Sequence, residues 1–142
     1  MTPEEISTYF RTMFPDADSM YAVESAGDRG AVVRLNFDAD HHVRPGNTVA
    51  GPALMALADV AVWVAVQAEV GPNLDIATVN LSIDFLRRPP AGDVRAVVRL
   101  LKVGRRLSVG DVVMYADGAA DPVARASVTF AVPAPQAEPA PA

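Results

Sequence analysis

The stretch PALMALADVAVWVAVQAEV, residues 52–70, decides the fold. Proline at its start, with Gly71 and Pro72 just beyond its end, predicts a single helix of about five turns. Between residues 53 and 66 the only charged or strongly polar residue is Asp59. A helix that is apolar on all sides is buried on all sides, so we expect it at the centre of the protein.

Segments with the two-residue alternation of β-strands flank this helix on both sides. The alternation predicts strands over residues 20–26 and 31–37 before the helix, and over 78–85, 94–103, 107–115 and 124–132 after it. A change of phase near Gly110 predicts a β-bulge in the strand 107–115. Residues 38–51 are polar and are expected to form a loop.

The order of these elements predicts an α+β fold, in which a curled antiparallel β-sheet wraps around a central buried helix. Thr2 and Glu5 form a capping-box pattern that predicts a short N-terminal helix over residues 3–14. We expect one domain over 1–132 with its core at 20–132, and a disordered Pro/Ala-rich tail over 133–142. A sheet wrapped around a helix leaves edge strands and part of the helix uncovered, so at least a homodimer is expected.

The composition narrows the possible functions. The 142 residues contain no cysteine, which excludes disulfides, thiolate metal sites and cysteine nucleophiles. A net charge of -5 argues against general nucleic-acid binding, which needs a basic surface. The acidic N-terminus lacks a signal sequence, so we expect a cytoplasmic protein. No membrane association is expected, because Asp59 at a bilayer centre would cost roughly 2.5 kcal/mol or more.

Asp59 and Gly51 are the residues that indicate chemistry. A carboxylate in an apolar helix costs several kcal/mol unless it is paired or protonated, which favours a functional role. The alternative, given equal weight, is an Asp that faces solvent or an interface arginine. Gly51 opens the helix, where free N–H groups hold a developing oxyanion. Eight residues span about 12 Å, too far for one helix to act on one carbonyl, but a dimer can pair one subunit's helix start with its neighbour's Asp59.

The run Gly46-Asn47-Thr48-Val49-Ala50-Gly51-Pro52, followed by Ala56-Leu57-Ala58-Asp59, resembles the signature of hotdog-fold thioesterases of the phenylacetate-degradation (PaaI-like) type. In that family a loop reading roughly G-T-V-H-G-G enters the central helix, and L-A-D follows with the acidic catalytic residue. The segments Phe85-Leu86-Arg87-Arg88-Pro89 and Gly104-Arg105-Arg106-Leu107 are also similar to that family's strand-end and hairpin sequences. The resemblance covers about residues 20–132.

The resemblance implies a hotdog fold and hydrolysis of an acyl-CoA thioester. Asp59 matches the catalytic carboxylate, which attacks the thioester or activates a water, and Gly51 matches the residue whose N–H polarises the carbonyl. In the family these two residues come from different subunits of a homodimer or homotetramer. No metal and no cofactor are used, because coenzyme A enters as part of the substrate.

The sequence departs from the family pattern at three positions. Ala50 replaces the family's histidine, Pro52 replaces the second glycine, and Arg44 stands where an asparagine is common. Asn47 is our candidate to replace the lost polar contacts in catalysis. The departures leave open slower catalysis, a different acyl group, or no catalysis.

Several polar residues are candidates for holding coenzyme A. Cationic side chains near strand ends suit its phosphates, and the predicted set is Arg44, Arg87, Arg88, Lys102, Arg105 and Arg106. Solvated hairpin charge is the favoured alternative for any single one of them. Asn80 either lines a substrate channel or faces water. His41 and His42 match no metal-ligand pattern and are interpreted as parts of a polar loop.

Thioester hydrolysis is therefore the predicted function, with a non-catalytic acyl-CoA binding or sensing protein as the alternative from another class. A hydratase of the same fold is less favoured, because the sequence lacks an Asp–His pair near Asp59. A purely structural oligomer is the remaining alternative.

Overall fold

The computed structural model describes residues 1–134, except the side chains of residues 17 and 18. The helices are α1 (Pro3–Met13), the 3-10 helix η1 (Pro15–Met20), α2 (Ala39–His42) and α3 (Gly51–Val70). The strands are β1 (Tyr21–Gly27), β2 (Gly30–Leu35), β3 (Val43–Arg44), β4 (Thr48–Val49), β5 (Ala77–Phe85), β6 (Val94–Val103), β7 (Leu107–Ala116) and β8 (Ala124–Ala131). Most of the predicted tail, residues 135–142, lies outside the described residues.

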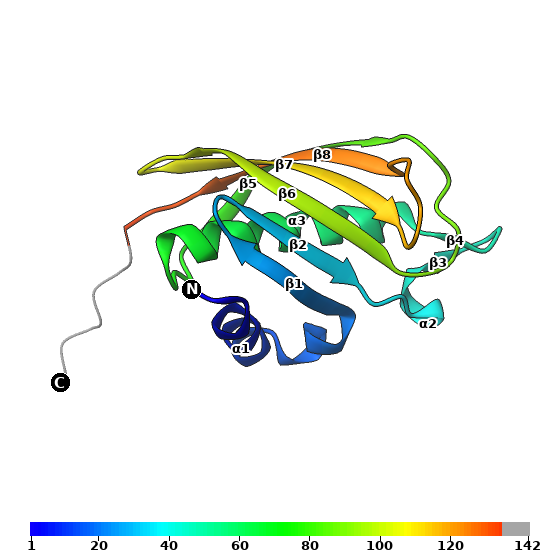
Figure 1. Cartoon of the computed structure of the whole chain (residues 1–142), viewed down its shortest axis with the longest axis horizontal. Coiled ribbons are helices and arrows are strands. Elements are labelled where there is room, and N and C mark those ends of the chain that lie inside the picture. Colours follow the sequence, from blue (N-terminus) through cyan, green and yellow to red (C-terminus); the bar gives the residue numbers. More distant parts are fainter. Residues whose placement is uncertain (135–142) are drawn as a thin grey trace.

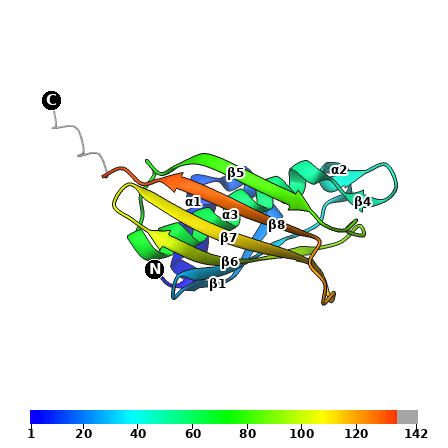
Figure 2. The same ribbon diagram turned by 90° about the horizontal axis from the view of Figure 1, so that it is seen from above.

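A six-stranded antiparallel sheet forms the main layer, with the strand order β1-β2-β6-β7-β8-β5. The sheet curves over α3, which runs beneath it (Figures 1 and 2). The predicted α+β fold, with a curled antiparallel sheet around a central helix and a short N-terminal helix, is confirmed. One edge strand is β1, on which α1 packs, and the other is β5.

Helix α3 provides much of the core. Nine of its residues are buried, and the sheet approaches it so closely that a Cβ atom on Gly110 would lie 2.8 Å from a methyl group of Val62. The length and mean hydropathy of α3 would suit a membrane span. However, 56% of its apolar 18-residue stretch is buried inside the protein, as in a core helix. One face remains uncovered, since Met55 is 41% exposed and Ala56 is exposed too. Within this chain, the expectation that the helix is buried on all sides is therefore wrong for this face.

Aromatic rings attach α1 to α3. The capping box is present, since the Glu5 N–H donates to Thr2 Oγ1 and the Thr2 N–H donates to Glu5 Oε2. Tyr9 stacks on Trp63 with ring centroids 5.7 Å apart, and Phe10 meets the same ring edge-on at 5.9 Å. The helix is thus held on the part of α3 that follows Asp59.

Two local expectations are wrong. The segment 38–51 is not all loop, because it contains α2 and the short β3–β4 pair. The bulge lies opposite Gly110 but on the neighbouring strand, where the pairing register shifts between Leu100 and Lys102. Buried and half-exposed residues alternate along β7 after its first residue, so the extra residue, Leu101, belongs to β6.

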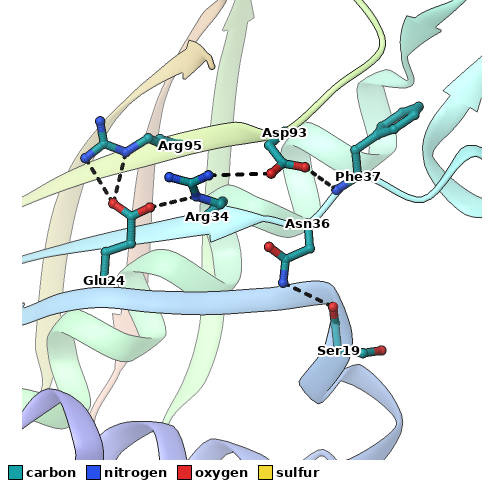
Figure 3. A network of polar contacts seen from close by, with 7 residues as sticks. All are labelled: Ser19, Glu24, Arg34, Asn36, Phe37, Asp93 and Arg95. Carbon is teal, nitrogen blue, oxygen red and sulfur yellow. Dashed lines mark hydrogen bonds and ion pairs between the residues drawn. The ribbon is translucent and has the colours of Figure 1, made fainter. Parts of the chain in front are cut away.

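A network of ion pairs ties β1, β2 and β6 together at the edge remote from β5 (Figure 3). Glu24 accepts hydrogen bonds from Arg34 Nε at 2.7 Å and from Arg95 Nε at 3.0 Å. Asp93 lies 3.5 Å from Arg34 and also accepts from the Phe37 N–H at 2.8 Å. Burial raises the pKa of Glu24, but its bonds to the two arginines outweigh burial and hold that pKa below its ordinary value.

Candidate active site

Asp59 lies half-buried on α3 and accepts a hydrogen bond from the hydroxyl of Thr78 in β5. The distance between Thr78 Oγ1 and Asp59 Oδ1 is 2.6 Å. One carboxylate oxygen is therefore bound and oriented by the sheet, and the carboxylate is neither enclosed in the core nor tied to a cation by any ion pair of the described residues.

A β-bulge in β5 aims Thr78 at the helix. The pairing of β5 with β8 shifts between Thr78 and Asn80, which leaves Val79 as the extra residue, 56% exposed. Thr78 then pairs with the buried Phe130 and faces inward, whereas Asn80 pairs with Thr129 on the outer face. A regular alternation along residues 78–85 would place Thr78 beside Asn80 and Val79 on the buried face, but the bulge reverses the direction of Thr78 and Val79. A bulge has no signature in this stretch of sequence, so Thr78 was missed.

An apolar pocket of about 360 Å³ opens beside Asp59. Apart from Asp59 and Thr78, its lining residues are apolar or aromatic: Phe10, Phe14, Tyr21, Val60, Trp63, Leu74, Ile76 and Phe130. Burial raises the pKa of the Tyr21 phenol, and the negative charge of Asp59 raises it further. Trp63 is half-buried and lines this pocket.

A second pocket, of about 370 Å³, lies at the start of α3 and is lined by Gly51. Ala50 makes no side-chain cap, and within residues 1–134 no hydrogen bond uses the Gly51 N–H. The first N–H groups of a helix lack partners inside the helix, so this group is available to an acceptor. The Phe85 ring is close, since a Cβ atom on Gly51 would lie 3.4 Å from it. The remaining lining includes Arg44, Arg87 and Arg88.

Asp59 and Gly51 therefore belong to different pockets of the chain. They are eight residues apart in a continuous helix, or about 12 Å along its axis. The third predicted catalytic residue, Asn47, is exposed in the turn between β3 and β4, with φ of 57°. Asn47 does not line either pocket, and its backbone N–H and C=O bond to Arg44 and Ala91.

The basic residues predicted to hold coenzyme A form two groups in the structure. Arg87 and Arg88 follow β5 at its Phe85 end, where Arg44 also lies. Leu107 and Ala77 both pair with Ala131, so the β6–β7 hairpin lies at the opposite end of the sheet. The second group belongs to that hairpin and comprises Lys102, Arg105 and Arg106. Sequence could not separate the groups, because it does not show which strand ends meet.

The remaining predicted residues lie outside the two pockets. Asn80 is exposed on the outer face of the sheet, as is Asp84, which lies 3.8 Å from Arg125. His41 Nδ1 lies 2.8 Å from Asp38 Oδ2. His42 is buried, and its Nδ1 accepts a hydrogen bond from the Asp38 N–H. Burial lowers the pKa of His42. Among the described residues no group of three or more His, Asp or Glu is placed to hold a metal ion.

Comparison with known proteins identifies the family. The profile described as Thioesterase superfamily matches residues 46–123, more than half of the chain. The matched segment contains both Gly51 and Asp59. No match was found among proteins with curated descriptions.

Solved structures agree with this family. A protein from Silicibacter sp. TM1040 assigned as a thioesterase is 37% identical, with a TM-score of 0.84 over 93% of this chain and 92% of that one. A conserved protein from Pseudomonas aeruginosa is 30% identical, with a TM-score of 0.73 over 83% and 92%. A variant of the phenylacetic acid degradation protein PaaI from Thermus thermophilus is 27% identical, with a TM-score of 0.70 over 82% and 97%.

The chain belongs to the thioesterase superfamily and has the hotdog fold of its PaaI-like members. Membership supports thioester hydrolysis as its general chemistry.

Proposed function

We propose that the protein is a cytoplasmic acyl-CoA thioesterase that acts as a homodimer, or as a dimer of such dimers. Asp59 of one subunit and the N–H of Gly51 of the partner subunit act on the same thioester carbonyl. The observation that carries this proposal is that Asp59 and Gly51, both on α3, contact opposite ends of the edge strand β5. Asp59 is bonded to Thr78 near one end, and Gly51 lies against Phe85 at the other.

Antiparallel pairing of β5 with its copy would join these ends. In a two-fold interface each residue meets a partner on the other side of the axis. The midpoint between Thr78 and Phe85 falls between Leu81 and Ser82. A two-fold axis at that point therefore places Thr78 of one subunit beside Phe85 of its partner, and Phe85 beside the partner's Thr78. Asp59 then approaches Gly51 of the partner subunit, and the apolar pocket of one subunit adjoins the arginine-lined pocket of its partner.

The surface of the subunit supports this pairing. Strand β5 is an edge of the sheet, and seven of its nine residues are exposed. Exposed apolar side chains accompany that edge, since Val79 is 56% and Phe85 is 54% exposed, and Met55 is uncovered on α3. An unprotected apolar edge strand is a site of pairing with another chain.

The two pockets have the chemistry of the two parts of an acyl-CoA. The pocket with Gly51 has three arginines, which suit phosphate groups of coenzyme A. The apolar pocket beside Asp59 suits the acyl group. No cofactor is needed, because coenzyme A is part of the substrate. Lys102, Arg105 and Arg106 of the β6–β7 hairpin line neither of the two pockets and are assigned no role in this arrangement.

The reaction needs one base and one oxyanion donor. Acting as a base, Asp59 takes a proton from a water whose oxygen attacks the thioester carbon. The carbonyl oxygen becomes an oxyanion held by the Gly51 N–H at the positive end of α3. The C–S bond then breaks, and the thiolate of coenzyme A takes the proton from Asp59. Acting as a nucleophile, Asp59 instead attacks the thioester carbon, and the C–S bond breaks to release the thiolate of coenzyme A and leave an anhydride. Water then hydrolyses the anhydride to the free acid and the Asp59 carboxylate, and a proton of that water passes to the thiolate.

The test is release of free thiol from a panel of acyl-CoAs by the wild type and by Asp59→Asn, which keeps the shape of the side chain but not its charge. We expect wild-type hydrolysis and a fall in kcat of roughly 10²-fold or more in the variant. If kcat of Asp59→Asn lay within a few-fold of the wild-type value, Asp59 would have no catalytic role. A wild type that binds acyl-CoA without hydrolysing it would favour a binding or sensing protein.

A further inference from the structure

We infer that the acyl specificity of this protein is set by Phe14 and Leu74, which limit an apolar pocket to uncharged acyl groups of restricted length. The inference rests on the proposed thioesterase function and concerns which substrate the site accepts. It assigns a role to the N-terminal helix, which lies outside the segment matched by the family profile.

The pocket beside Asp59 selects against charge. Of its ten lining residues none is cationic, and Asp59 is the only carboxylate. A second carboxylate, at the far end of a dicarboxylic acyl group, would lose water among apolar side chains and lie near the charge of Asp59. Acyl groups with a terminal carboxylate are therefore poor substrates, whereas alkyl chains gain by burial.

Phe14 forms one part of the pocket rim and is fixed by its neighbours. It caps the C-terminal end of α1, where its N–H donates to the Phe10 carbonyl. Its ring meets Trp63 edge-on with centroids 5.6 Å apart and Phe10 at 5.3 Å. Even so the residue is 44% exposed, so one side of the ring is free to meet a ligand.

Leu74 forms another part of the rim from the segment between α3 and β5. It is 62% exposed although its neighbour Asn73 is buried. The backbone C=O and N–H of Asn73 form hydrogen bonds of 2.7 and 2.9 Å with the buried side chain of Gln67. The side-chain amide of Asn73 donates a further hydrogen bond to the Pro133 carbonyl. These bonds fix the backbone beside Leu74, so the Leu74 side chain stays at the pocket although it is largely exposed.

Apolar side chains held at the rim of a pocket reduce the space that a long acyl chain can occupy. Removing the Phe14 ring or the Leu74 isobutyl group would open this side while leaving Asp59 and Thr78 in place. Both side chains are partly exposed, so their replacement by alanine spares the core.

The experiment compares kcat/KM for butyryl-, hexanoyl-, octanoyl-, decanoyl- and glutaryl-CoA in the wild type, Phe14→Ala, Leu74→Ala and Leu107→Ala. Leu107 is the matched control, because it is 42% exposed and does not line the pocket. We expect glutaryl-CoA to be cleaved roughly 10²-fold less efficiently than hexanoyl-CoA. We expect Phe14→Ala and Leu74→Ala to raise the decanoyl-to-hexanoyl ratio of kcat/KM about tenfold, and Leu107→Ala to leave it unchanged.

The outcomes separate the inference from the function beneath it. The inference would be wrong if all four proteins hydrolysed the thioesters with the same chain-length profile, or if they preferred glutaryl-CoA. Either result would leave the proposed thioesterase function intact. No hydrolysis of any thioester by the wild type would overturn both.

Discussion

Thr78 donates a hydrogen bond of 2.6 Å to Asp59, joining an edge strand of the sheet to the central helix. The bond depends on the bulge at Val79, which turns Thr78 from the outer face of β5 to the inner one. It fixes one oxygen of the carboxylate and leaves the other for a water or a thioester. Because β5 is also the proposed dimer edge, the strand that would bind the partner also positions the base.

Thr78→Val keeps the shape of this side chain and removes its hydroxyl. We expect kcat to fall about tenfold, because the carboxylate loses the group that orients it. Thr78→Ser keeps a hydroxyl and should restore most of the rate. The measurement is kcat and KM for acyl-CoA hydrolysis with the three proteins. Equal kcat in the wild type and Thr78→Val would show that the bond has no part in catalysis.

The Gly51 N–H can be removed with little change to the backbone. Gly51→Pro deletes this N–H at the first position of α3, where proline is tolerated, and Ala50 already has the extended conformation that precedes proline. Gly51→Ala keeps the N–H and adds the same Cβ against Phe85. We expect kcat to fall roughly 10²-fold or more in Gly51→Pro and by only a few-fold in Gly51→Ala. Similar losses in both variants would indicate crowding and not a missing hydrogen-bond donor.

Glu24 should make stability depend on pH. Its folded-state pKa lies below the ordinary value of 4.5, so its contribution is present above pH 4.5 and is lost as the pH falls through the folded-state value. At pH 7 we expect Glu24→Gln to lower the free energy of unfolding by about 0.5–1 kcal/mol, a small effect because the network is partly exposed. The difference from the wild type should shrink as the pH falls below 4.5 and through the folded-state pKa of Glu24.

Urea unfolding at a series of pH values measures this effect. Asp121→Asn is a suitable control, because Asp121 is exposed and no ion pair of the described residues involves it. A loss of stability in Glu24→Gln that is the same at pH 3 and pH 7 would contradict a role for the charge.

Much of the fold could be predicted from the sequence, because its signals are local. Strand β6 runs from Val94 to Val103, as its run of valine and leucine predicted, and α3 begins one residue before the predicted start at Pro52. Both elements are long apolar runs that end at turn or cap residues, so composition and boundary residues identify them without a periodic pattern. The short helix and hairpin within 38–51 have too few residues to show any period.

The site could be predicted only in part. Asp59 and Gly51 stand out in the sequence, one as a charge in an apolar helix and the other at the start of that helix. Thr78 does not, because its direction depends on a bulge that the register with β8 determines. The arginines were predicted only as a set of candidates near strand ends, and the sheet topology is needed to place Arg105 and Arg87 at opposite ends of the sheet.

The central claim is that each active site takes Asp59 from one subunit and Gly51 from its partner. The direct test is to unfold and refold Asp59→Asn and Gly51→Pro proteins together and to measure acyl-CoA hydrolysis by the mixture. In a mixed dimer one site has both defects and the other has none. An equal mixture should therefore regain about a quarter of wild-type activity by random assortment, although each variant alone keeps roughly a hundredth of it or less. A mixture that forms mixed dimers but stays as inactive as its components would contradict a site shared between subunits.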